Sequence, residues 1–210
     1  MKLSRKNTLP LNRIEALSDG IFAIAMTILV LNISLPEKEA VQSLGLHRVL
    51  FNHLNEFIIY FMSFFLLGVF WMIQRKQMSS LVATDQNHMW LNIIMLMYIC
   101  LVPFSASLQS TYNSDWVAAF TFSANMLIIA LLFLFIWHYA TSKNRLVSPE
   151  FSREDALHGE RNTWIFIVVS TISMGASFFI PEYSALFFLL IPILKSILHR
   201  FSGRSGKDES

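Results

Sequence analysis

The stretch Arg13-Ile14-Glu15-Ala16-Leu17-Ser18-Asp19-Gly20, with the apolar run that continues from Ile21 to Leu35, decides the fold of this chain. Its start is polar, and the remainder fits a helix that crosses a bilayer, which takes about 17–25 residues. Pro36 cannot continue a helix, so the first helix is predicted over residues 14–35. A charged Asp at the centre of a membrane costs about 2.5–3.5 kcal/mol on insertion scales. Asp19 is therefore expected either to be paired with a neighbouring helix or to belong to a working site.

The composition indicates a membrane protein. Hydrophobic residues make up 54% of the chain and charged residues only 14%, whereas a soluble domain has about 25% charged residues. We expect one transmembrane domain over residues 1–200 and a disordered polar tail over 201–210. The single cysteine, Cys100, excludes an intramolecular disulfide, and the net charge of +2 gives no indication of a nucleic-acid partner.

Hydrophobic runs recur through almost the whole chain and predict an all-α membrane protein. Short connections make the third and fourth runs, and the fifth and sixth, helical hairpins. The segment 37–52 is too polar to span and is expected to form a short surface helix on the outer side. The six predicted spans are residues 14–35, 57–73, 89–108, 116–139, 164–180 and 183–198.

The basic residues predict the orientation of these spans. Of the 16 Lys and Arg residues, only Lys38 and Arg48 fall on one side of the six-span arrangement, and the others fall on the opposite side. Cytoplasmic loops carry the excess of Lys and Arg. Both termini are therefore predicted to be cytoplasmic.

Enzymes and filter-type channels are disfavoured. The histidines lie at span ends or in loops, Asp19 is a lone carboxylate near a span interior, and no metal-ligand spacing of Cys and His appears. The chain also lacks the Thr-Val-Gly-Tyr-Gly loop of potassium-channel filters and an inverted repeat of spans. A pore in this protein would have to be lined by helix side chains from several subunits.

Two sets of residues in the first span could serve such a pore. Ile24, Ile28, Leu31 and Leu35 form one stripe at helical spacing, with Thr27 beside it. A stripe of Ile and Leu at this spacing is more typical of helix packing or lipid contact than of a pore, and the spacing alone leaves these alternatives open. Asp19 lies about 140° round the helix from the stripe, so its partners should come from neighbouring helices. The polar candidates at the same level, expected to form one buried network, are Trp71, Gln74, Arg75, Trp90 and Asn92.

The entrance of the first span resembles a known family. Arg13-xxx-Leu17-Ser18-Asp19 is similar to the Arg-xxx-Phe-Ser-Asp signature of the transmembrane-protein-175 potassium channels. Leu17 replaces the signature Phe, and Gln74 stands where the family would have a His. Further matches follow in order at Phe70-Trp71, Asp85 with Trp90-Leu91-Asn92, and Pro103-Phe104-Ser105.

This resemblance implies a homotetrameric channel in the inner membrane of a prokaryote that favours potassium weakly over sodium. It implies no cofactor and no metal other than K⁺ in transit. Ile24, Ile28 and Leu31 would form the constriction, with Thr27 as a polar contact, while Arg13, Ser18 and Asp19 would hold the pore helix in place. The alternatives are a proton-coupled or carrier-type transporter in which Asp19 titrates, and a membrane scaffold without transport.

Overall fold

The computed structural model describes residues 11–148 and 150–194, and the regular elements in this part of the chain are all helical. The predicted all-α class is therefore confirmed. Within these residues, four helices are long and apolar enough to cross a membrane: Leu11–Asn32, Leu54–Ser79, Gln86–Thr111 and Trp116–Asn144. Two shorter apolar helices follow, Thr163–Ala176 and Pro181–Leu194. The last residues of the sixth predicted span and the predicted tail lie outside the described residues.

Helix α1 (Leu11–Ile28) continues as a 3-10 turn over Leu29–Asn32 and ends earlier than the predicted residue 35. The backbone is already extended at Ile33, with φ −84° and ψ 114°. Two hydrogen bonds to other helices explain the early end. The Asn32 side chain donates to the carbonyl oxygen of Pro103 at 2.7 Å, and the Ser34 amide donates to Glu56 at 2.7 Å. Leu35 therefore does not lie on the helical stripe, and that part of the prediction is wrong.

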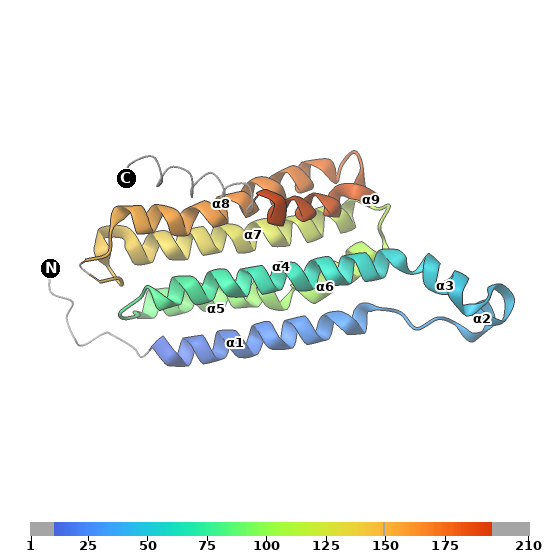
Figure 1. Ribbon diagram of the computed structural model, residues 1–210, viewed down its shortest axis with the longest axis horizontal. Helices are drawn as coiled ribbons and strands as arrows, with labels where there is room; N and C mark the ends of the chain where they lie inside the picture. The colour runs from blue at the N-terminus through green and yellow to red at the C-terminus, as the bar shows by residue number, and fades with distance from the viewer. Residues whose placement is uncertain (1–10, 149, 195–210) are drawn as a thin grey trace, which may run out of the picture.

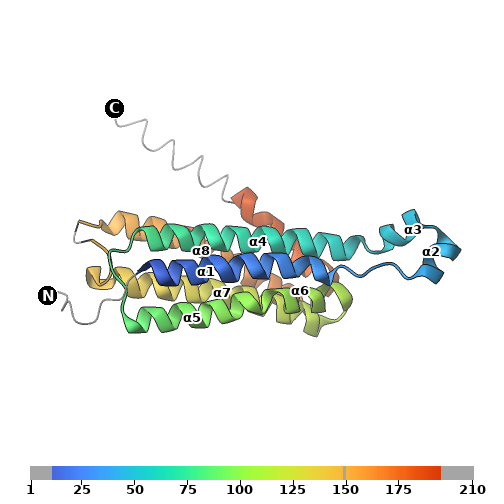
Figure 2. The ribbon, with the colours of Figure 1, turned by 90° about the horizontal axis from the view of Figure 1, so that it is seen from below.

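Two short helices, α2 (Lys38–Leu44) and α3 (Leu46–Asn52), occupy the segment predicted as one surface helix. They meet at Gly45, whose φ of +79° lies in the region that glycine adopts without a steric penalty. Figures 1 and 2 show this pair projecting beyond one end of the bundle. We call this end of the molecule the hairpin end.

The second and third predicted spans become three helices, α4 (Leu54–Ser79), α5 (Gln86–Cys100) and α6 (Val102–Thr111). The third predicted span, residues 89–108, lies within the apolar helix Gln86–Thr111, which a turn at Leu101, two residues before Pro103, divides into α5 and α6. Proline has no amide hydrogen to donate within a helix and clashes with the preceding turn. Helix α5 begins before residue 89, where the Asp85 carboxylate accepts a hydrogen bond from the His88 amide at 2.9 Å.

Helices α7 (Trp116–Thr141) and α8 (Arg153–Ala176) lie side by side and antiparallel (Figure 1). The chain then turns back through α9 (Pro181–Ser184) and a 3-10 turn over Ala185–Leu189. The core between α4, α7 and α8 is aromatic. Phe70 stacks on Phe133 with a centroid distance of 5.5 Å and lies 4.5 Å from the Phe166 centroid. All three side chains are almost fully buried.

Helix α1 lies at the edge of the molecule. Figure 1 shows α1 on one side, α4 to α6 in the middle, and α7 to α9 on the far side. The start of α1, the α4–α5 connection and the α7–α8 connection share the end opposite α2 and α3. Because this end carries Arg13, Arg75, Lys76, Lys143 and Arg145, we call it the basic end.

Candidate functional site

One face of α1 is buried in the bundle and the opposite face is left uncovered by its own chain. The buried face carries Ile14, Ser18, Phe22, Ala25 and Leu29. On the uncovered face, Ile24 is 59% exposed, Ile28 41% and Leu31 78%. Within the described residues, this stripe does not serve packing inside the subunit. An apolar surface of this kind marks contact with lipid or with another protein chain.

Thr27 lies on the same uncovered face and is the polar residue among the stripe's neighbours. Its hydroxyl donates to the carbonyl oxygen of Ile24 at 2.8 Å. The hydroxyl oxygen retains lone pairs that can accept a hydrogen bond or contact a cation. The uncovered face therefore combines apolar bulk with one polar oxygen per chain.

Ser18 anchors the buried side of α1 to α4 and α5. Gln74 donates through Nε2 to Ser18 Oγ at 2.9 Å and to Asn92 Oδ1 at 3.3 Å. Asn92 in turn donates through Nδ2 to the His88 carbonyl oxygen at 2.8 Å. None of these side chains is more than 3% exposed. We call Ser18, Gln74, His88 and Asn92 the buried amide cluster.

Asp19 belongs to a separate, exposed group. Trp71 Nε1 donates to Asp19 Oδ1 at 2.8 Å, and the Arg75 guanidinium lies 3.5 Å from Asp19 Oδ2. The side chains of Arg75 and Asp19 are 54% and 42% exposed. The prediction that Asp19 shares one buried network with Gln74 and Asn92 is therefore wrong. Consecutive residues of a helix point about 100° apart, so Ser18 and Asp19 reach different surroundings.

Arg13 and Trp90 do not join either group in the described part of the chain. Both side chains are exposed, and none of the contacts found among residues 11–148 and 150–194 ties them to the other predicted members. The structure thus brings together Ser18 with Gln74 and Asn92, and Asp19 with Trp71 and Arg75.

Sequence reasoning missed His88, which it treated as an ordinary histidine at a span end. His88 is 1% exposed, and its Nδ1 lies 2.8 Å from the Thr84 hydroxyl. The sequence feature that could have identified His88 as buried is its position, three residues after the capping Asp85 and four before Asn92. At that spacing His88 and Asn92 share one helix face, and the cap directs this face into the bundle.

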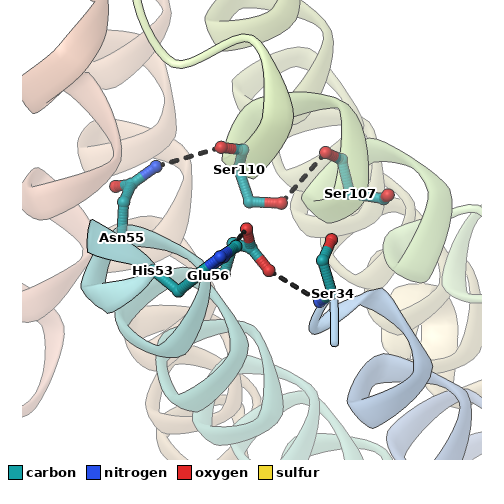
Figure 3. A network of polar contacts seen from close by, with 6 residues as sticks. All are labelled: Ser34, His53, Asn55, Glu56, Ser107 and Ser110. Carbon is teal, nitrogen blue, oxygen red and sulfur yellow. Dashed lines mark hydrogen bonds and ion pairs between the residues drawn. The ribbon is translucent and has the colours of Figure 1, made fainter. Parts of the chain in front are cut away.

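The hairpin end holds α1 through a second polar group, also missed from the sequence (Figure 3). The Glu56 carboxylate accepts from the Ser34 amide and lies 2.7 Å from His53 Nδ1. Asn55 donates to the carbonyl oxygen of Ser110 at 3.2 Å. Both ends of α1 are thus bonded to α4, whereas the stripe between them remains uncovered.

The described residues contain no group of His, Cys, Asp and Glu side chains that could hold a metal ion. A groove of about 370 Å³ runs beside α1 and is lined by Ile24, Ile28, Asn32, Cys100 and Phe104, among others. The candidate site is therefore an apolar helix face with a groove at its side, supported by polar contacts at both ends.

Comparison with known proteins finds several relatives. Residues 13–103 match the family described as the endosomal/lysosomal potassium channel TMEM175. The chain is 33% identical over 146 residues to a potassium channel of Chamaesiphon minutus, a match that spans 68% of this chain and 72% of that protein. It is 32% identical over 141 residues to a potassium channel of Streptomyces collinus, spanning 65% and 68% of the two proteins.

The fold also matches a crystal structure of a lysosomal potassium-selective channel TMEM175 homologue from Chamaesiphon minutus. The TM-score is 0.79 at 26% identity, and the match covers 89% of this chain and 96% of that one. The matched family region begins at Arg13 and ends at Pro103, so it includes the buried amide cluster and the uncovered stripe.

Proposed function

Because this chain belongs to the TMEM175 family of potassium channels, we propose that it forms a homotetrameric cation channel whose pore is lined by α1 of each subunit. TMEM175 is a family of ion channels and not of enzymes. Its named bacterial relatives are potassium channels. We further propose which helix lines the pore, which residues form its constriction and how many subunits assemble.

The observation that carries the proposal is the apolar stripe that the subunit leaves uncovered. Ile24, Ile28 and Leu31 are exposed on α1, which lies at the edge of the molecule (Figure 1). Four such edges brought together around an axis would close a pore and remove the stripes from lipid. The groove beside α1 would then lie next to the neighbouring subunit.

Apolar rings can select among ions through dehydration. A narrow hydrophobic constriction resists the passage of water and of ions that keep their water. Sodium holds its hydration shell more tightly than potassium, so a ring of Ile and Leu side chains penalises sodium more. Thr27 supplies a hydroxyl oxygen near the Ile24 and Ile28 rings. We therefore propose a channel that favours potassium over sodium to a modest degree.

The polar residues at the basic end serve as positioning residues in this scheme. The bond between Ser18 and Gln74, and those from Asp19 to Trp71 and Arg75, fix the rotation of α1 about its axis. A rotation of one residue position would turn the stripe by about 100°. Arg13 and Trp90, which are exposed in the single subunit, are available to lipid or to a neighbouring subunit.

We propose that the basic end faces the cytoplasm of a prokaryotic cell and that the hairpin end lies outside. The positive-inside rule supports this orientation. Of the Lys and Arg residues that the structure describes, only Lys38 and Arg48 lie at the hairpin end. The six spans would be α1, α4, the α5–α6 pair, α7, the apolar part of α8, and the helix that begins at α9.

Ion flux from liposomes tests the lining. Ile24→Asn, Ile28→Asn and Leu31→Asn, each placed in the full chain, should change the conductance or the permeability ratio of K⁺ to Na⁺. Ile172→Asn on α8, at a residue that is 48% exposed, is the matched control and should leave both unchanged. If flux is indifferent to all three substitutions in α1, the lining is wrong. Single-channel current steps at fixed voltage distinguish a channel from a carrier, which shows none.

A further inference from the structure

A small cavity lies behind the buried amide cluster, between α4, α5 and α7. Its volume is about 10 Å³. Gln74 and Gln77 line it from α4, His88 and Asn92 from α5, and Ala140 from α7. A site of about 10–15 Å³ with two to four polar partners suits one buried water molecule.

The hydrogen bonds of the cluster fix which way its amides point. Because Asn92 donates through Nδ2 to the His88 carbonyl oxygen at 2.8 Å, its Oδ1 is the acceptor that faces Gln74. Gln74 must then present Nε2 to Asn92 Oδ1, as it does at 3.3 Å, and to Ser18 Oγ at 2.9 Å. Turning the Gln74 amide over would set two oxygens against each other. The acceptor Oε1 of Gln74 therefore points away from both partners.

Two residues that line the cavity each have a buried polar atom without a hydrogen-bond partner among the described residues. Gln74 Oε1 is buried and accepts no hydrogen bond from the described residues. Gln77 Nε2 is buried and donates none to them. The residues are 3% and 7% exposed, respectively. One atom is an acceptor and the other a donor, and their residues line the same cavity. Most buried polar groups in folded proteins are bonded to protein or to ordered water.

We propose that one structural water molecule binds in this cavity, accepting a hydrogen bond from Gln77 Nε2 and donating one to Gln74 Oε1. The water completes the bonding of Gln74, whose other atoms hold Ser18 of α1. It thereby extends the support of α1 one turn further along α4, to Gln77. This inference concerns the support of α1 and does not depend on what the channel conducts.

Magic-angle-spinning NMR of the full-length chain in lipid bilayers tests the site through magnetisation transfer from water to amide groups. The protein is labelled with ¹⁵N at Gln and Asn, and the Gln77 signal is assigned by its loss in Gln77→Met. The backbone amide of Asn125 is the internal reference, because it lies within helix α7 and its residue does not line the cavity. The Asn125 side chain is not used, because its Oδ1 is also buried without a partner among the described residues. Transfer to Gln77 should build up several-fold faster than transfer to Asn125. Equal rates at the two amides would overturn the proposal.

A pair of matched variants tests the location of the water. Ala140→Val adds two methyl groups to a residue of the cavity lining, whereas Ala130→Val adds them to a buried residue of the same helix that does not line it. The fast transfer to Gln77 should disappear in Ala140→Val and persist in Ala130→Val. Fast transfer that persists in Ala140→Val would place the water elsewhere and contradict the proposal. If Ala140→Val does not fold, the comparison of Gln77 with Asn125 in the unaltered protein decides.

Discussion

Ser18 and Asp19 are adjacent in the chain, yet the first is 1% exposed and the second carries a side chain that is 42% exposed. The hydroxyl of Ser18 is small and neutral, so a single amide satisfies it inside the bundle. The carboxylate of Asp19 keeps contact with solvent and with the guanidinium of Arg75, because a charge removed from water without a close partner is costly. The two residues therefore secure α1 by different means.

Gln74→Met tests the buried contact. The substitution keeps the length of the side chain but removes the donor to Ser18 and Asn92. Leaving the Asn92 oxygen buried without a donor should lower the free energy of unfolding by about 1–3 kcal/mol. Thermal unfolding of the detergent-solubilised protein, followed by tryptophan fluorescence, measures the loss. Gln86→Met, at an exposed residue of α5, is the control, and equal midpoints for the two variants would contradict the assignment.

Asp19 should respond differently to two substitutions. Asp19→Asn keeps an oxygen that accepts from Trp71 and loses only an exposed ion pair, which is worth about 0–1 kcal/mol. Asp19→Leu removes both contacts and should reduce stability and assembly more strongly. Unfolding midpoints and size-exclusion profiles compare the two. If Asp19→Asn proves as damaging as Asp19→Leu, the charge itself has a role that the Trp71 and Arg75 contacts do not explain.

Among the elements, α1 is held at its two ends and free along the face between them. The buried amide cluster fixes the basic end, and the Ser34–Glu56 bond fixes the hairpin end. The helix tightens into a 3-10 turn over Leu29–Asn32 before it ends. Such turns are common at helix ends, where they bond some of the terminal carbonyl groups. The exposed stripe is therefore carried by an element whose position is set by others.

Helices α7 and α8 pack closely at Gly159. A Cβ atom added at Gly159 would lie 2.6 Å from ring atoms of Trp137, whereas one added at Gly175 on the same helix would meet nothing within 4 Å. Gly159→Ala should therefore destabilise the protein by about 1–3 kcal/mol through overpacking. Gly175→Ala should be neutral or stabilising by up to about 1 kcal/mol, because alanine favours helix. Thermal unfolding of both variants provides the measurement, and a stabilised Gly159→Ala would contradict the packing.

In the whole molecule, most of the described basic residues lie at one end of the bundle and α1 lies along its edge. The basic residues of α1, of the last turns of α4 and of the α7–α8 connection gather at one end (Figure 1). Helix α1 lies along the edge of the bundle (Figure 1), and its apolar face is exposed. Placing the basic end in the cytoplasm leaves this face within the membrane, where another subunit can cover it.

Cross-linking tests whether the stripes of neighbouring subunits meet. In a Cys100→Ser background, Ile24→Cys should give subunit dimers on mild oxidation, because the proposed pore brings the same residue of each subunit to the axis. Ile172→Cys on α8 should give none. Native mass spectrometry should detect an assembly of four chains of 24.2 kDa each. Dimers from Ile172→Cys and none from Ile24→Cys would contradict the proposed arrangement.

The sequence by itself determined the properties that depend on local composition and spacing. Hydropathy established the membrane class. The segregation of Lys and Arg predicted which connections share an end. The helical register of the first span pointed Asp19 away from Ile24 and predicted partners on neighbouring helices, and Trp71 of α4 is one of them.

Only the tertiary structure decided which faces are covered, because burial depends on the neighbours that a segment meets and not on its own residues. It separated Ser18 from Asp19, buried His88, and ended α1 before Leu35 through partners on α4 and α6. It also left Ile24, Ile28 and Leu31 uncovered. Periodicity alone could not distinguish a stripe that packs within its own bundle from one that faces outward, since both repeat every 3.6 residues.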